Sequence, residues 1–259
     1  MKSLLKKISK LNLITKIRNY TGIRPVALNN NNLTNNCTIS DAFIWRTDNN
    51  FKTYFKYTDL LKLFFNKENS KIIVNFYDKK HNLIKQINNK NIELSNTIEI
   101  NKDFLKGLED YGVFYIFHQL DEEINSSIRN SCYTGFSLND ELPSFVHGNC
   151  PTLHMPIKNY NESDDKQTKD IVGLSLFQNK KYKIQNYFKN LSKLEIFLQN
   201  PTSKKIKIKI NNFSFELNAK CSIIHDTSKL NTIEIVSNCY FLRPIIFCYK
   251  NQYIDVHHG

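Results

Sequence analysis

The chain contains few of the residues that interrupt regular structure. Only 7 Gly and 6 Pro occur among its 259 residues, which excludes collagen-like and Gly/Pro-rich low-complexity proteins. Hydrophobic residues make up 41% of the chain and aromatic residues 12%, enough apolar surface to exclude a wholly disordered protein. We therefore expect a globular protein of one large or two small domains.

Arginine is also scarce. Of the 36 lysines and arginines, only Arg18, Arg24, Arg46, Arg129 and Arg243 are arginine. Arginine is the side chain best shaped for paired contacts with phosphate or guanine. Its scarcity counts against nucleic acid as the partner, although the formal net charge is +12.

Acidic residues are absent before Asp41, while seven cations precede it, so the other residues carry only +5 of the formal charge of +12. Residues 2–18 place Leu4, Ile8 and Leu11 on one line with the lysines mostly opposite, which predicts a basic amphipathic helix. An Asn-rich linker follows to residue 36. The helix is expected to pack on the protein, to contact an anionic membrane surface, or to act as a transit peptide.

The chain has no C-x-x-C pair, no apolar run of the roughly 18 to 20 residues that a membrane helix needs, and no secretory signal. We interpret its cysteines as thiols in a reducing compartment. The expected location is the cytoplasm, at the inner membrane face if the helix binds lipid. The six cysteines are Cys37, Cys132, Cys150, Cys221, Cys239 and Cys248.

Short strand patterns separated by turns continue from residue 37 to the end. Ile72–Tyr77 and Val113–His118 are typical strands, and Lys205–Ile210 alternates strictly. This succession of short strands and turns predicts an all-β protein in which two tandem β-sandwich domains follow the helix. We place the domains at residues 37–150 and 171–259, with a linker at 151–170 that contains two prolines and an acidic run.

The two predicted domains show matching patterns that suggest an internal duplication. Ile72–Phe76 matches Leu194–Leu198 at an offset of 122 residues, and Val146–Gly148 matches Val256–His258 at an offset of 110. The decreasing offset is what two collinear copies would give if the loops of the second were shorter. Val113–Phe117 also matches Ile233–Ser237, and Cys132-Tyr133 matches Cys248-Tyr249.

The candidate ligand-binding motifs are two His-bearing segments, SFVHGN (residues 144–149) and YIDVHHG (residues 253–259), and the segment WRTD (residues 45–48). Each His-bearing segment follows an Arg and a Tyr, and WRTD joins the only Trp to a cation and a carboxylate in an expected loop. Alternatively, the histidines hydrogen-bond turns and the aromatics belong to the core. The candidate ligand residues are Trp45, Arg46, Asp48, Arg129, Tyr133, His147, Asn149, Arg243, Asp255, His257 and His258.

Catalytic and metal motifs are missing. The chain has no G-x-S-x-G, no phosphate loop and no H-E-x-x-H. His147, His154, Asp255, His257 and His258 lack the spacing of a zinc site. We therefore expect no metal, no cofactor and no catalytic residue.

Four segments in the first predicted domain carry a resemblance to a known group of proteins: SDAFIWRTDNNFKTYF, SKIIVNFYDKKHNLIKQ, YGVFYIFHQ and SCYTGFSLNDELPSFVHGN. Together they resemble β-rich proteins encoded among bacterial surface-polysaccharide biosynthesis genes. The resemblance covers mainly residues 40–150, with an echo in FLRPIIFCYKNQYIDVHHG. It implies a glycan context and supplies no catalytic residue.

These observations together predict a non-catalytic binding or scaffolding protein of glycan assembly, whose partners are a glycan or glycan-assembly proteins. The alternative is a metal- or carboxylate-dependent carbohydrate-active enzyme that uses the His-bearing segments.

Overall fold

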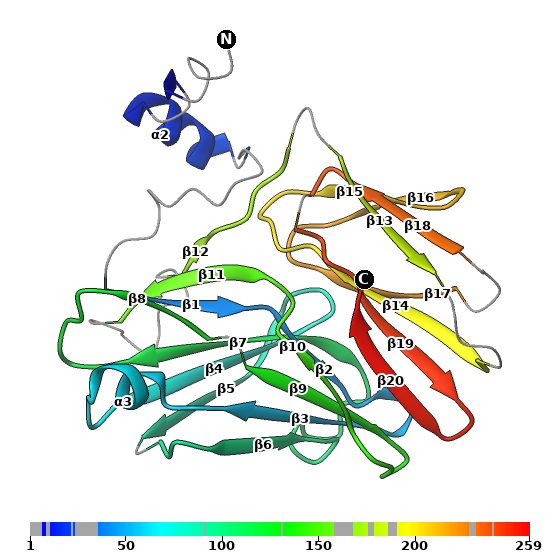
Figure 1. The fold of residues 1–259 in the computed structure, drawn as a ribbon, viewed down its shortest axis with the longest axis horizontal. Coiled ribbons are helices and arrows are strands. Elements are labelled where there is room, and N and C mark those ends of the chain that lie inside the picture. Colours follow the sequence, from blue (N-terminus) through cyan, green and yellow to red (C-terminus); the bar gives the residue numbers. More distant parts are fainter. Residues whose placement is uncertain are drawn as a thin grey trace.

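The structure is a computed structural model, and it describes residues 7–8, 11–21, 23, 36–90, 92–130, 132–157, 168–175, 179–185, 191–227, 232–239 and 241–259. About 55% of the protein is strand, so the predicted all-β class is confirmed. The described strands form five four-stranded sheets. We call residues 37–157 the first half and residues 171–259 the second half. Figure 1 shows the first half, in blue to green, lying beside the second half, in yellow-green to red.

The first half contains two sheets that pack face to face. Sheet I has the strand order β2-β7-β4-β5, and sheet II has the order β10-β9-β3-β6. Phe43, Phe55, Phe76 and Phe114 stack between them and are fully buried. The strands are β2 (Phe43–Arg46), β3 (Phe51–Tyr57), β4 (Lys71–Asp78), β5 (Leu83–Lys90), β6 (Asn96–Ile100), β7 (Tyr111–Gln119), β9 (Tyr133–Leu138) and β10 (Ser144–His147), with the short helices η2 (Asp48–Asn50) and α3 (Leu60–Phe65) between them.

The second half also has two packed sheets. Sheet III has the order β13-β18-β15-β16, and sheet IV has the order β20-β19-β14-β17. In β15, Ile206, Ile208 and Ile210 point into their shared core while Lys207 and Lys209 are exposed, as the alternating sequence predicts. The strands are β13 (Lys180–Gln185), β14 (Lys193–Gln199), β15 (Ile206–Ile210), β16 (Phe213–Leu217), β17 (Ser222–Asp226), β18 (Thr232–Ser237), β19 (Ile245–Lys250) and β20 (Tyr253–His258).

The two halves repeat the same strand order. Sheet I corresponds to sheet III when β2, β4, β5 and β7 are matched in chain order to β13, β15, β16 and β18. Sheet II corresponds to sheet IV when β3, β6, β9 and β10 are matched to β14, β17, β19 and β20, and every pairing in both sets is antiparallel. The topology thus repeats, while an origin by duplication stays a prediction.

The sequence match between Ile72–Phe76 and Leu194–Leu198 equates two strands that do not occupy equivalent places in the sheets. It matches β4 with β14, whereas the strand order matches β4 with β15. The matches made further along the chain, which join β7 to β18, β9 to β19 and β10 to β20, agree with the strand order. Alternating strands resemble one another, so a shift by one strand leaves the hydrophobic pattern intact.

A fifth sheet lies against sheet I and includes part of the segment expected to be a linker. Pro151–Pro156 forms strand β11, which pairs with β1, and Leu153 and Met155 are buried. The linker prediction is therefore wrong for these residues, and residues 158–167 lie outside the described part. Sheet V has the order β12-β11-β1-β8, formed by β1 (Cys37–Asp41), β8 (Ser127–Asn130), β11 (Pro151–Pro156) and β12 (Lys169–Asp170).

The halves share one hydrophobic core. One face of sheet IV packs on sheet III, and its other face supplies Phe197, Phe247 and Val256 to a cluster that also contains Phe51 and Phe136 of the first half. Phe247 meets the rings of Phe51 and Phe136 edge-on, with centroids 5.9 and 5.0 Å apart. Burial of this shared surface holds the halves in a fixed relation.

The predicted N-terminal helix is confirmed in part. Residues 7–8 are helical and helix α2 spans Asn12–Thr21, while residues 2–6 and most of the Asn-rich linker lie outside the described part. Within the described residues, no helix is both long enough and apolar enough to cross a membrane.

Candidate functional site at the seam between the halves

The WRTD segment lies inside the protein. Trp45 and Arg46 belong to strand β2, and both side chains are fully buried. The indole Nε1 of Trp45 donates a hydrogen bond to the backbone oxygen of Tyr77 at 2.9 Å. The prediction of an exposed loop is therefore wrong here, and a ligand on the surface does not reach either side chain.

Arg46 forms an ion pair that links the two halves. Its Nε and Nη2 donate to the two carboxylate oxygens of Asp48 at 2.9 and 2.7 Å, and its Nη1 donates to Glu195 of the second half at 2.8 Å. The guanidinium lies 4.0 Å from the ring centroid of Phe51 and 4.7 Å from that of Phe247. A buried cation is tolerated when carboxylates and ring faces surround it in this way.

Glu195 is ionised within this network. Burial alone would raise the pKa of its carboxyl, but the charge of Arg46 and hydrogen bonds from Lys193 and Tyr249 lower that pKa below its ordinary value. The hydroxyl of Tyr249 donates to Glu195 at 2.5 Å. Arg46 and Glu195 are 149 positions apart, so no local sequence signal could have revealed this network.

Arg243 binds the turn that follows β10, and Arg129 binds Asp41 beside that turn. Arg129 donates to both carboxylate oxygens of Asp41 at 2.8 Å, and Arg243 donates to the backbone oxygen of Asn149 at 2.8 Å. The turn fits tightly because a Cβ on Gly148 would lie 2.6 Å from the Cβ of Asp41. Arg243 therefore contacts the predicted motif directly, Arg129 contacts it only through Asp41, and Asn149 is buried.

The two His-bearing segments meet. Strands β10 and β20, which are equivalent in the repeated topology, contact each other through unpaired edges. The Ser144 hydroxyl accepts a hydrogen bond from the backbone nitrogen of Val256 at 2.9 Å and donates to Asp255 at 3.4 Å. His258 lies against His147. We call this contact the seam.

The seam holds three histidines beside Arg243 and Asp255. Burial is the main cause that lowers the pKa of His258 to about 4, and the charges of Arg243, His147 and His257 lower it further. His258 is therefore neutral at pH 7. His257 places Nδ1 3.3 Å from the Asp255 carboxylate, with both side chains substantially exposed.

The outer face of sheet II carries an aromatic surface beside the seam. Tyr133 and His147 are cross-strand partners whose rings lie 4.2 Å apart, and Tyr133 is 46% exposed. Phe145 is 39% exposed and rests on Gly135, where a Cβ would lie 2.5 Å from the ring. The ammonium of Lys56 lies 5.1 Å from the Phe145 centroid. We call Tyr54, Lys56, Tyr133, Phe145 and His147 the platform, because strand register places all five on one face.

The sequence interpretation included Tyr133 and His147 and missed Phe145 and Lys56. Alternation along Ser144–His147 would have placed Phe145 on the same face as His147. The partnership of Lys56 with Tyr133 depends on strands far apart in the chain, so only the pairing register reveals it.

The described residues contain no group of three or more His, Cys, Asp or Glu side chains arranged to hold a metal ion. His154, from the candidate set, lies buried in β11. Burial raises the pKa of Cys132 to about 12 and that of Cys150 to about 11. Both thiols are protonated at neutral pH and therefore poor nucleophiles.

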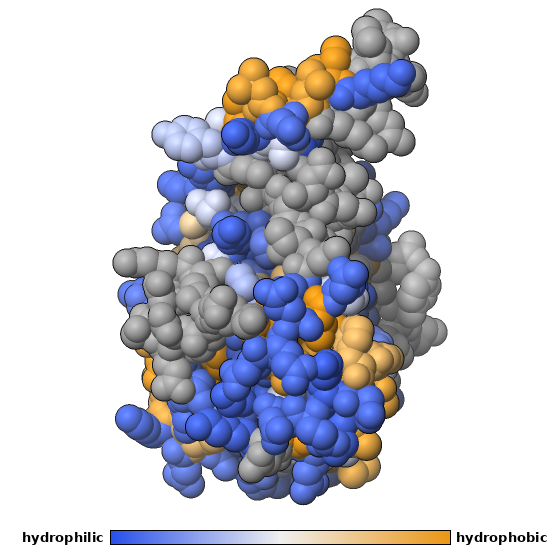
Figure 2. All heavy atoms as spheres, turned by 90° about the vertical axis from the view of Figure 1, so that its left-hand side faces the viewer, coloured by the Kyte–Doolittle hydropathy of each residue, from blue (hydrophilic) through white to orange (hydrophobic). Residues whose placement is uncertain are grey.

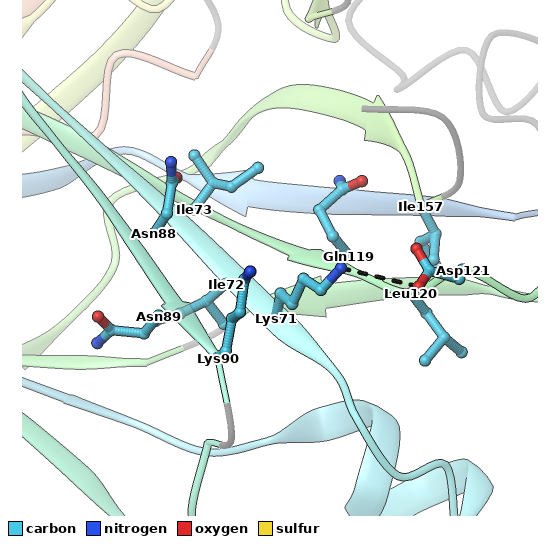
Figure 3. Close-up of a pocket in the computed structure, with 10 residues that line it drawn as sticks. All are labelled: Lys71, Ile72, Ile73, Asn88, Asn89, Lys90, Gln119, Leu120, Asp121 and Ile157. Carbon is cyan, nitrogen blue, oxygen red and sulfur yellow. Dashed lines mark ion pairs between the residues drawn. The ribbon is translucent and has the colours of Figure 1, made fainter. Parts of the chain in front are cut away.

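A cavity of about 120 Å³ lies elsewhere, on sheet I (Figure 3). Lys71 and Lys90 are cross-strand partners at its rim, and the Lys71 ammonium lies 3.7 Å from the Asp121 carboxylate. None of the predicted ligand residues lines it. Its walls are Lys71, Ile72, Ile73, Asn88, Asn89, Lys90, Gln119, Leu120, Asp121 and Ile157.

Comparison with protein families, curated proteins and solved structures found no family, no curated protein and no solved structure that matches this chain.

Proposed function

We propose that the protein is a non-catalytic binding protein of glycan assembly that holds an oligosaccharide across the platform and the seam. The observation that carries the proposal is the meeting of the two His-bearing segments beside exposed aromatic rings. Sugar-ring recognition needs a flat apolar surface with a few polar groups at its border. Tyr133 and Phe145 offer the surface, and His147, Asp255 and His257 offer donors and acceptors.

The rigidity of the site supports the same function. Sheet II presents the platform from regular strands, and Arg46 and the shared core hold β20 against β10. A site assembled before the ligand arrives loses less conformational entropy on binding.

We predict that Tyr133→Ala/Phe145→Ala weakens oligosaccharide binding at least tenfold, because a sugar that covers roughly 60 Å² of the two rings gains about 1.5 kcal/mol at about 25 cal/mol per Å² of apolar surface. An array of neutral and acidic oligosaccharides, probed with wild type and variant, measures the effect. Phe213→Ala is the matched control, because Phe213 is an exposed aromatic stacked on His225 in the second half.

The control should bind like wild type. The proposal fails if wild type binds no oligosaccharide on the array, or if the double variant binds as well as Phe213→Ala does. Shortening of the bound oligosaccharide by the wild-type protein would instead favour the enzyme alternative, for which the exposed Asp255–His257 pair offers an acid–base couple.

A further inference from the structure

Helix α2 presents an apolar stripe that no described residue covers. Leu13, Ile17 and Tyr20 follow one another at the i, i+4 and i+7 positions of one helix face. Their side chains are 68%, 49% and 91% exposed. In Figure 2 hydrophobic side chains gather at the top of the molecule, the position at which Figure 1 shows α2. The stripe is not the predicted line of Leu4, Ile8 and Leu11, none of which belongs to α2.

The surroundings of the stripe are cationic. Lys16 is exposed beside it, Arg18 lies in the last turn, and α2 contains no acidic residue. The sequence up to Asp41 adds five further cations and no acid. An amphipathic helix with this combination suits an anionic interface, where apolar side chains enter the headgroup region and cations meet lipid phosphates.

A second copy of the chain is a poorer occupant. Pairing two α2 stripes would bring together two acid-free basic segments of a protein whose net charge is +12, and like charges repel at such an interface. Ile23, shortly after the helix, forms a bridge with Leu174 of the second half, which ties the chain close to α2 to the body.

We propose that Leu13, Ile17 and Tyr20 dock the protein on a bilayer that contains anionic lipid. These three side chains enter the headgroup and upper acyl region of the bilayer, and α2 lies along the membrane surface. This docking is separate from the glycan site, because the platform and the seam contain no residue of α2.

The test is flotation of the full chain with vesicles of phosphatidylcholine alone or with an equal share of phosphatidylglycerol. Wild type should bind the anionic vesicles at least tenfold more strongly, and the preference should shrink as the Debye length falls from ~10 Å in 0.1 M salt to ~3 Å in 1 M salt. Leu13→Ser/Ile17→Ser/Tyr20→Ser should lose at least tenfold in binding. Leu83→Ser/Leu142→Ser/Phe213→Ser, which removes three exposed apolar side chains from the body, should bind like wild type.

A second variant reports insertion directly. The only native Trp is fully buried Trp45, so the emission of a Tyr20→Trp variant should shift to shorter wavelength only when anionic vesicles are added. Equal binding by the two triple variants, equal binding to both vesicle types, or an unchanged Tyr20→Trp emission would overturn the proposal. So would a dimer in vesicle-free sedimentation that the α2 triple variant abolishes. Glycan binding by that variant should be unchanged, which keeps the two proposals distinguishable.

Discussion

Replacing Arg46 with Met is expected to lower the free energy of unfolding by about 3–5 kcal/mol. The substitution keeps much of the side-chain volume but leaves the Glu195 carboxylate, which is 6% exposed, without its buried cation. It also removes the cation from the ring faces of Phe51 and Phe247. Urea titration followed by the fluorescence of Trp45, the neighbour of Arg46 in β2, measures the change.

The control is Lys205→Met, which breaks an ion pair with Glu216 in which both side chains are about half-exposed. Such a pair contributes about 0–1 kcal/mol. Combining Arg46→Met with Glu195→Gln should recover part of the lost stability, because the buried Glu195 charge, which then has only the partly exposed Lys193 as its cation, is gone. If Arg46→Met costs no more than Lys205→Met, the buried network does not hold the halves together.

Replacing Phe247 with Ala is expected to lower the free energy of unfolding by about 3–5 kcal/mol, as is usual for a large buried aromatic side chain. Phe247 lies in the second half but packs edge-on against Phe51 and Phe136 of the first half. The unfolding midpoint reported by Trp45, in the first half, should therefore fall as well. Hydrogen exchange of peptides from both halves should show the same loss of protection.

Phe213→Ala provides the contrast, because Phe213 belongs to the same half and is about half-exposed. It should leave the Trp45 transition nearly unchanged. Two separate unfolding transitions, with the Trp45 transition unaffected by Phe247→Ala, would mean that the halves fold independently and that the seam is not held by a common core.

Strand patterns were the part of the fold that the sequence predicted well. The alternation of Lys205–Ile210 and the apolar run of Val113–His118 match β15 and β7, because one side of each strand must face a core. The segment Pro151–Pro156 was misread as linker because of its prolines. Pro151 and Pro156 occupy the two ends of β11, where a missing amide donor is tolerated.

The candidate site was predicted in part. The sequence marked His147, Asp255, His257 and His258 as candidates but left open whether their segments meet, and the structure brings strands β10 and β20 into contact. Arg46 was misread because its carboxylate partner Glu195 lies in the other half, so the residues around Arg46 looked like a polar loop. Such pairings depend on how the sheets pack, which short-range patterns do not encode.

Nuclear magnetic resonance of histidine side chains tests the glycan-binding seam most directly. A ¹⁵N-histidine-labelled sample should first show His258 titrating with a pKa of about 4. Adding the oligosaccharide that gives the strongest array signal should then shift the ring resonances of His147 and His257, while those of buried His118 stay in place. If the oligosaccharide binds but the ring resonances of neither His147 nor His257 shift, the ligand site is not at the seam.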